Sequence, residues 1–307
     1  MNGIINIYKE RGYTSHDVVA RLRGILHTKK IGHTGTLDPM AEGVLPVCVG
    51  DATKLCESLS DHDKEYETVM LLGKTYDTLD VTGVILEEHG VMSTKEDIIN
   101  AVSSFIGGYE QTPPMYSAKK INGKKLCDLA RDGIVVERKP VFVKIYDINI
   151  VSVEIPRVTM RVKCQKGTYI RSLIDDIGKS LGCGAAMEEL VRTRVGDFTI
   201  DKAHRLADIE DAMEFGRISD VIIGLEEVFA DLDCIRANSG ISRLLRNGNV
   251  ISGKEIRREA EDITKHIADG TRFRMYDDRN VFLGVYEYKI AGDIYKPYKM
   301  FPNMYPA

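Results

Sequence analysis

The chain has 307 residues, of which 43% are hydrophobic and 29% charged, which is typical of a globular protein with one large domain or two unequal ones. No apolar run approaches the roughly 18 residues of a membrane span, and the first residues lack the basic and apolar regions of a secretion signal, so neither a membrane protein nor a secreted one is expected. The six cysteines are scattered without metal-ligand spacing, which argues against zinc and disulfide frameworks and favours a reducing, cytoplasmic setting.

The N-terminal region predicts a strand followed by a helix. Residues 3–8 form the expected strand. Ser15 is then expected to cap a helix, because apolar residues recur with a 3.6-residue period from Val18 to Leu26. A first group of basic residues lies on and after this helix: Arg21, Arg23, Lys29 and Lys30.

Residues 32–55 are interrupted by four glycines and two prolines, yet residues 44–49 form an apolar run that predicts a buried strand. Pro39 biases the backbone of Asp38 towards an extended conformation. A carboxylate is therefore fixed at a bend on a strand-backed loop, where binding and catalytic groups are often found. An Asp-Pro pair taken alone more often marks a turn in which the aspartate caps its own backbone.

The whole window resembles the signature of the TruB family of tRNA pseudouridine synthases. In that family the loop reads Gly-His-Thr-Gly-small-Leu-Asp-Pro and is followed by Gly-x-Leu-Pro and Ala-Thr-Lys. All three parts are present here in that order. The resemblance places Asp38 at the family's catalytic aspartate, and it extends closely over residues 1 to about 200 and loosely over the rest.

Beyond the signature, residues 51–62 are predicted to be helical and residues 66–72 to form a strand. Residues 63–68 match a second family motif, whose tyrosine stacks on the target base. This tyrosine is Tyr66 here, although a tyrosine in a strand more often packs in a core or at its rim.

Residues 73–83 resemble a hairpin of the family, and its carboxylates Asp77 and Asp80 are expected to be solvated turn residues. Thr94 and Asp97 then predict the start of a helix by a capping box in which Asp replaces Glu or Gln.

Residues 111–125 contain two prolines, one glycine and four lysines without an apolar period, which predicts a long exposed loop. They match the family's thumb segment, which lies against RNA, and the thumb loop is expected to span about residues 107–133. The lysines assigned to RNA backbone contacts are Lys119, Lys120, Lys124 and Lys125, together with Lys166 from the next motif.

Residues 141–165 predict two antiparallel strands around Pro156, and residues 166–171 match the third family motif. Thr168 is expected to cap the following helix, and Gly182 to end it. Arg171 lies in the first turn, where the helix dipole disfavours a cation. This placement indicates an anionic partner, either Asp175 or a group brought in by the fold, and the resemblance implies that this group is Asp38.

The C-terminal third begins with an acidic stretch, residues 201–233, that is helical in outline. It holds ten Asp and Glu against three Lys and Arg, a net charge of −7, so the rest of the chain carries +3 of the total −4. Later segments suggest a small β-rich module with a hairpin turn at residues 277–280. The predicted domains are therefore residues 1–234, a catalytic domain that includes the acidic connector, and residues 235–307, a PUA-like domain.

The resemblance implies an α+β pseudouridine-synthase fold, with a mixed, largely antiparallel central sheet, flanking helices and an RNA-binding thumb loop. In this reading Asp38 is the nucleophile and Arg171 keeps it ionised and aimed. Tyr66 stacks under the uracil, Tyr169 supports the pocket, and Leu190 lines it.

Two further residues have more than one interpretation. Lys9 matches a lysine of the family's opening motif and is assigned to substrate binding, with an ordinary surface lysine as the alternative. For His33 the resemblance implies that it fills the space vacated by flipped nucleotides. An acid-base role and a purely structural role stay open.

We expect a stand-alone, monomeric tRNA pseudouridine synthase that flips and isomerises the T-loop uridine, position 55 in the tRNA convention. It should bind the T stem-loop and need no metal, cofactor or obligate protein partner. The alternatives are a guide-RNA-dependent catalytic subunit and a non-catalytic tRNA-folding or RNA-binding protein. A carbohydrate-active enzyme is disfavoured because the chain has no tryptophan to form a sugar platform.

Overall fold

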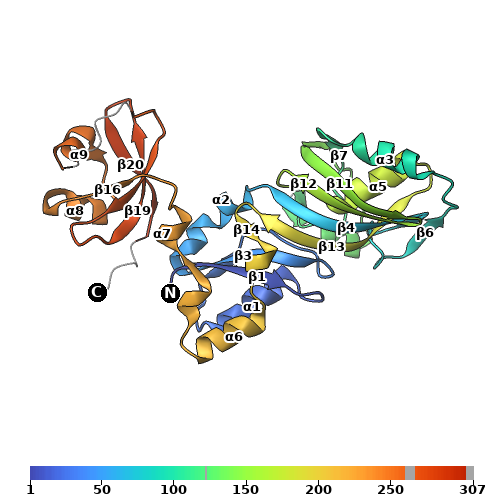
Figure 1. Cartoon of the computed structure of the whole chain (residues 1–307), viewed down its shortest axis with the longest axis horizontal. Coiled ribbons are helices and arrows are strands. Elements are labelled where there is room, and N and C mark those ends of the chain that lie inside the picture. The colour runs from blue at the N-terminus through green and yellow to red at the C-terminus, as the bar shows by residue number, and fades with distance from the viewer. Residues whose placement is uncertain (122, 260–266, 302–307) are drawn as a thin grey trace.

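A computed structural model of the chain describes residues 1–121, 123–259 and 267–301. Asn122 of the predicted thumb loop, and residues 260–266 and 302–307 of the predicted C-terminal domain, lie outside the described residues. Figure 1 shows an elongated molecule in which one long curved sheet is followed by a small separate sheet at the C-terminal end. None of the helices in the described ranges has the length and apolar character needed to cross a membrane.

The central sheet has nine strands in the order β11-β12-β4-β13-β3-β1-β15, with β2 beside β3 and β14 beside β13. Among these strands the β13–β3 pair is parallel and the other pairs are antiparallel. The prediction of a mixed, largely antiparallel sheet in an α+β fold is therefore confirmed. The strands are β1 (Gly3–Lys9), β2 (Ile31–His33), β3 (Glu42–Val49), β4 (Lys64–Leu72), β11 (Ile145–Glu154), β12 (Arg157–Cys164), β13 (Ala185–Val195), β14 (Phe198–Thr199) and β15 (Ile222–Gly224).

Two apolar cores lie against this sheet, one on each side of the β13–β3 junction. Helices α3 (Lys95–Ser103) and α5 (Ile170–Ser180) pack with β4, β12 and β13 in the first core. Helices α1 (Ser15–Ile25) and α6 (Leu206–Glu214) pack with β1 and β3 in the second. The loop that carries Asp38 joins β2 to β3, and its Leu37 and Ala41 pack in the first core together with α5, the helix that carries Arg171.

Two helix starts differ from the prediction. Thr14, and not Ser15, caps α1: its hydroxyl accepts from the Asp17 N–H at 3.0 Å, and the Asp17 carboxylate accepts from the Thr14 N–H at 2.8 Å. Tyr169 occupies the N-cap position of α5 without a side-chain cap, while the Thr168 hydroxyl donates to a backbone carbonyl at 2.8 Å. The cap of α1 is thus the local pair Thr14 and Asp17, while the Ser15 hydroxyl contacts the Leu37 N–H instead.

Other local predictions are confirmed. Thr94 and Asp97 form the expected capping box of α3, and Gly182 ends α5 with a φ of 71° in the left-handed region. Pro156 lies between the antiparallel strands β11 and β12. The predicted helical segment 51–62 is a 3-10 turn, η1 (Gly50–Leu55), that continues into α2 (Cys56–Ser60).

The predicted thumb loop has more secondary structure than its sequence indicates. The strand β7 pairs with β10, a short β8–β9 hairpin carries four of the lysines on or beside it, and α4 follows. Leu126 and Leu129 of α4 are buried, a pair too short to give a recognisable period. The elements of this region and of the preceding hairpin are β5 (Lys74–Tyr76), β6 (Ile85–Glu88), β7 (Tyr109–Gln111), β8 (Lys120–Ile121), β9 (Lys124–Lys125), α4 (Leu126–Arg131) and β10 (Val141–Val143).

The acidic connector is only partly helical. Its apolar residues 222–224 form β15, which pairs antiparallel with β1 at the edge of the central sheet. Without β15, the backbone N–H and C=O groups along this edge of β1 would have no hydrogen-bond partners. Helix propensity, which depends on neighbouring residues, does not reveal this pairing. The connector also contains η2 (Ile200–Lys202), η3 (Ile218–Asp220) and α7 (Leu225–Val228).

The C-terminal region is β-rich, as predicted. In its described residues five strands follow the order β16-β18-β19-β20-β17, and helices α8 and α9 accompany them. Tyr276, Phe282 and Phe301 pack in one core with Ile4 and Leu55, so the small sheet is joined to the catalytic part by apolar contact. The elements are β16 (Cys234–Arg236), α8 (Ser239–Arg246), β17 (Ile251–Ser252), α9 (Gly253–Glu259), β18 (Arg272–Tyr276), β19 (Phe282–Lys289) and β20 (Ile294–Met300).

Candidate active site

The loop that carries Asp38 runs between β2 and β3 and is held from behind. The fully buried Lys9 of β1 donates its Nζ to the Ala41 carbonyl at 2.6 Å, and to the Pro39 carbonyl at 3.2 Å. On the other side of Asp38, the hydroxyl of Ser15 accepts from the backbone N–H that precedes the aspartate, at 2.9 Å. These contacts fix both neighbours of the carboxylate.

Arg192 of β13 holds the earlier part of the same loop. Its side chain is 1% exposed and donates to the carbonyls of Val44 at 2.7 Å, Gly35 at 3.2 Å and Thr36 at 3.4 Å. Arg192 is also the residue of β13 that pairs with Tyr66 of β4 in the central sheet. A buried arginine thus links the loop to the strand that carries Tyr66.

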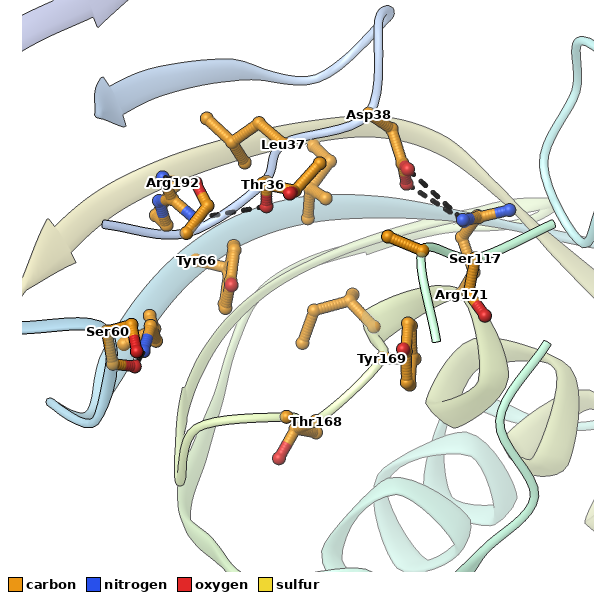
Figure 2. Close-up of a pocket in the computed structure, with 16 residues that line it drawn as sticks. Thr36, Leu37, Asp38, Ser60, Tyr66, Ser117, Thr168, Tyr169, Arg171 and Arg192 are labelled. Carbon is orange, nitrogen blue, oxygen red and sulfur yellow. Dashed lines mark hydrogen bonds and ion pairs between the residues drawn. The ribbon is translucent and has the colours of Figure 1, made fainter. Parts of the chain in front are cut away.

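Asp38 and Arg171 form a two-point ion pair although 133 residues separate them in the sequence (Figure 2). Arg171 Nε lies 2.9 Å from Asp38 Oδ2, and Arg171 Nη2 lies 3.2 Å from Oδ1. The guanidinium also donates to the carbonyls of Thr78 at 2.9 Å and Tyr116 at 2.7 Å. These carbonyls fix the plane of the guanidinium, so that Nε and Nη2 face the two carboxylate oxygens. Such a two-point contact fixes the orientation of the carboxylate as well as attracting it.

Asp175, the other partner considered for Arg171, instead forms an ion pair with Lys179 at 2.6 Å. Asp80 from the β5–β6 hairpin lies 3.8 Å from Arg171 Nη1, and its side chain is only 15% exposed. The expectation that Asp80 is a solvated turn residue is therefore wrong, because the hairpin folds over the ion pair. Asp77 is exposed and accepts a backbone N–H within the turn, as expected.

A cavity of about 270 Å³ opens beside the ion pair. Five of the predicted site residues line it: Asp38, Tyr66, Tyr169, Arg171 and Leu190. Figure 2 labels the first four of them. A second cavity of about 560 Å³ shares Asp38, Arg171 and Leu190 and extends towards α1 and the thumb segment. Asp38 therefore lies where a small enclosed space meets a wider one.

The environment of Asp38 combines opposing electrostatic effects. Burial raises the pKa of Asp38 above its ordinary value, Arg171 lowers it, and Asp80 raises it further. The side chain still has 37% of its surface exposed, so the carboxylate lies in a dense cleft that a ligand can enter. Burial also raises the pKa of Tyr66 to about 12, against the effect of Arg192, so this hydroxyl is protonated near neutral pH.

The structure corrects the assignment of Lys9. Its side chain is fully buried behind the loop and does not line either cavity described above, so it is neither a surface lysine nor placed for substrate contact. His33 in β2 also lies outside both linings. Its ring packs edge-on against His16 with centroids 5.9 Å apart, and its Nδ1 accepts from the Gly35 N–H at 3.3 Å. Burial lowers the pKa of His33.

The predicted RNA-contacting lysines are all exposed: Lys119, Lys120, Lys124, Lys125 and Lys166. Lys125 also lines the wider cavity, whereas Lys166 forms an ion pair with Asp61 at 2.6 Å. Within the described ranges, no three His, Cys, Asp or Glu side chains are grouped so that they could hold a metal ion.

Sequence reasoning missed three cavity or ion-pair residues: Lys64, Asp80 and Arg192. Lys64 was detectable in principle, because it lies two residues before Tyr66 and so belongs to the buried face of β4. A charged residue at a position that the strand period assigns to the interior is an informative exception.

Comparison with known proteins identifies the family. A sequence model described as TruB family pseudouridylate synthase (N terminal domain) matches residues 23–170, and one described as tRNA pseudouridylate synthase B C-terminal domain matches residues 171–232. The chain is also 47% identical to tRNA pseudouridine synthase B of Lachnoclostridium phytofermentans, an alignment that covers 98% of this chain and 100% of that protein. The chain belongs to the TruB family of pseudouridylate synthases.

Other TruB-family similarities agree with this placement. The tRNA pseudouridine synthase B of Clostridium acetobutylicum is 43% identical, with 93% of this chain and 95% of that protein covered. Among solved structures, a chain of a Cbf5-Nop10-Gar1 complex superposes with a TM-score of 0.71 at 27% identity, covering 99% of this chain and 87% of that one. Membership of the family makes the protein an enzyme of the isomerase class.

Proposed function

We propose that this enzyme is a tRNA pseudouridine synthase that isomerises the T-loop uridine, position 55 in the tRNA convention. The observation that carries the proposal is the two-point pairing of Asp38 with Arg171 on the wall of a cavity that also exposes Tyr66. Curated relatives that match nearly the whole chain are named tRNA pseudouridine synthase B, which supports tRNA as the substrate.

In this proposal Asp38 is the nucleophile. Conversion of uridine to pseudouridine breaks the C1′–N1 bond, rotates the base and joins C1′ to C5, so one carboxylate attacking either C1′ or the base suffices. Arg171 aligns this carboxylate and opposes the rise in its pKa that burial produces. The base must leave its stack to reach the cavity, which costs a few kcal/mol.

The other cavity residues would bind the flipped base. Tyr66 provides a stacking surface worth ~1–3 kcal/mol, while Tyr169 and Leu190 close the pocket around the ring. We retain His33 as the residue that fills the space left by flipped nucleotides, because it lies in the strand that leads into the catalytic loop. Lys9 acts indirectly, by holding the carbonyls on the far side of Asp38.

We further propose that the enzyme acts in the cytoplasm as a stand-alone monomer, without a guide RNA, cofactor or obligate protein partner. The relatives named tRNA pseudouridine synthase B match more closely in sequence than the guide-dependent assembly does, at 47% against 27% identity. The exposed thumb lysines would contact the RNA backbone. The catalytic domain would span residues 1–234 and the C-terminal domain residues 235–307, a boundary that lies within one residue of Cys234, where β16 begins the small sheet.

The test is incubation of the purified chain with a bare T stem-loop RNA, followed by mapping of pseudouridine at each position. Stoichiometric conversion of the T-loop uridine, and of no other uridine, is the expected result. Absence of product without added guide RNA or protein would exclude the stand-alone activity. Activity that appears only on adding a guide would instead support the guide-dependent alternative.

A further inference from the structure

Two buried cations line the same cavity as Asp38 and have no role in the proposal above. Lys64 of β4 is 7% exposed and Arg192 of β13 is 1% exposed, and both belong to the lining of the 270 Å³ cavity. Figure 2 shows Arg192, and the Ser60 whose carbonyl Lys64 contacts, on one side of Tyr66, with Asp38 on the other. The cavity therefore has a cationic end opposite the nucleophile.

In the described residues, the hydrogen bonds of these two side chains go to uncharged groups. Lys64 Nζ donates to the carbonyls of Ser60 at 2.6 Å and His62 at 2.5 Å, and Arg192 donates to three loop carbonyls. Within the described part of the chain, neither cation forms an ion pair with a carboxylate. Asp61 and Asp63 attract Lys64 without forming an ion pair with it, and burial still lowers its pKa. A buried charge without a close counter-charge is destabilising, so its presence at a cavity wall favours an anion that arrives with the ligand.

Lys9 shows what a purely structural buried lysine looks like in this fold. It too donates only to backbone carbonyls, yet it does not line either cavity beside Asp38. Lys64 differs because it shares the inward face of β4 with Tyr66, two residues away, and reaches the same space. The carbonyl contacts of Lys64 therefore do not by themselves explain why this lysine lines the cavity.

The isomerisation produces an anion at this place. When the C1′–N1 bond breaks in the route through C1′, the bonding pair stays on the base, and a carboxylate oxygen of Asp38 bonds to C1′. The negative charge moves from Asp38 to the detached uracil and spreads over N1, O2 and O4. The base then rotates, C5 bonds to C1′ and the carboxylate leaves. Loss of the C5 proton and gain of one at N1 complete an isomer of the starting nucleoside.

We propose that Lys64 and Arg192 stabilise the detached uracil as an anion while it rotates. The inference rests on the proposed function. With the sugar beside Asp38 and the base over Tyr66, the far edge of the ring lies towards the two cations. Their carbonyl contacts and burial fix the charges before reaction, the condition under which electrostatic stabilisation is strongest. Burial lowers the pKa of Lys64 to about 8, which leaves the ammonium largely protonated near neutral pH.

The test compares leaving groups. Single-turnover rates of C1′–N1 cleavage are measured on T stem-loop RNAs with uridine or 5-fluorouridine at the target position. Fluorine withdraws electrons and stabilises the detached uracil anion, so cleavage of 5-fluorouridine should depend less on nearby cations. Lys64→Met should lower the rate about 100-fold with uridine but at most about threefold with 5-fluorouridine, with unchanged RNA affinity. Lys64→Arg should stay within about fivefold of the parent, and Lys95→Met, an exposed lysine in α3, serves as the charge-matched control.

Equal losses on both RNAs would show that Lys64 acts only on structure, and an unchanged rate would equally overturn the proposal. If Lys64→Met fails to fold, the parent protein decides alone. Free 5-nitrouracil, an anion near neutral pH, should inhibit at least about tenfold more strongly than uracil. Equal inhibition by the two would show that Lys64 and Arg192 do not favour an anionic base in this cavity. A parent that makes no pseudouridine contradicts the proposed function instead, so the two failures are distinguishable.

Discussion

The hydroxyl of Ser15 accepts a hydrogen bond from the Leu37 N–H at 2.9 Å, and it thereby ties the first turn of α1 to the residue before Asp38. Ser15 is 2% exposed and Leu37 is 4% exposed. Water therefore cannot readily replace this contact. The catalytic loop thus takes part of its shape from a helix that lies outside it.

Ser15→Ala should disturb that loop. Removal of the hydroxyl leaves a buried N–H without a partner, which costs about 1–3 kcal/mol, and we expect kcat to fall at least tenfold as Asp38 moves. Thr14→Ala removes the adjacent helix cap, which costs about 1 kcal/mol, and should leave kcat near the parent value. Denaturant unfolding and single-turnover kinetics on both variants test this difference. Equal effects on kcat would show that helix stability, and not loop position, is what matters.

Asp38→Asn should abolish pseudouridine formation, because an amide cannot act as the carboxylate nucleophile. RNA affinity should stay within about tenfold of the parent, since the stacking surface and basic residues are untouched. Gel-shift titration and pseudouridine mapping on the same preparation measure both. Turnover equal to that of the parent would remove Asp38 from the mechanism.

Arg171→Met should damage both stability and activity. The arginine is 5% exposed and supplies donors to two backbone carbonyls as well as to Asp38. Loss of one partner from a fully buried ion pair costs about 3–5 kcal/mol, and the cost here should be smaller because the Asp38 side chain is 37% exposed. Arg171→Lys keeps the charge but cannot contact Asp38 at two points, so we expect it to recover stability better than kcat. Full activity in Arg171→Lys would show that the two-point contact of the guanidinium is not needed to orient Asp38.

Activity should fall on acidification at a pH above the ordinary aspartate range. The reactive form of Asp38 is the carboxylate, and burial raises its pKa, so protonation begins at a higher pH than for an exposed aspartate. Arg171→Met removes the opposing effect and should move this acid limb to still higher pH. The pH dependence of kcat/KM for parent and variant, with folding checked across the same range by circular dichroism, tests both statements. An acid limb at or below the ordinary value in the parent would contradict the environment described for Asp38.

The sequence by itself determined the parts of the site that depend on neighbours along the chain. Pro39 and the following apolar strand fix a bent loop for Asp38, and the two-residue period places Tyr66 on the inward face of β4. Gly182 ends the helix whose first turn carries Arg171. Such features arise from backbone sterics and side-chain periodicity, which act over a few residues.

Only the tertiary structure decided which side chains meet. The burial of Lys9 and the folding of Asp80 over the ion pair depend on partners far away in the sequence, and so does the contact that ties Ser15 to Leu37. The same holds for Arg192, whose charge looks like an ordinary surface charge until the sheet encloses it beside the cavity, whereas the two-residue period of β4 already places Lys64 on the inward face. Burial and long-range pairing are properties of the assembled sheet, and no local rule of sequence contains them.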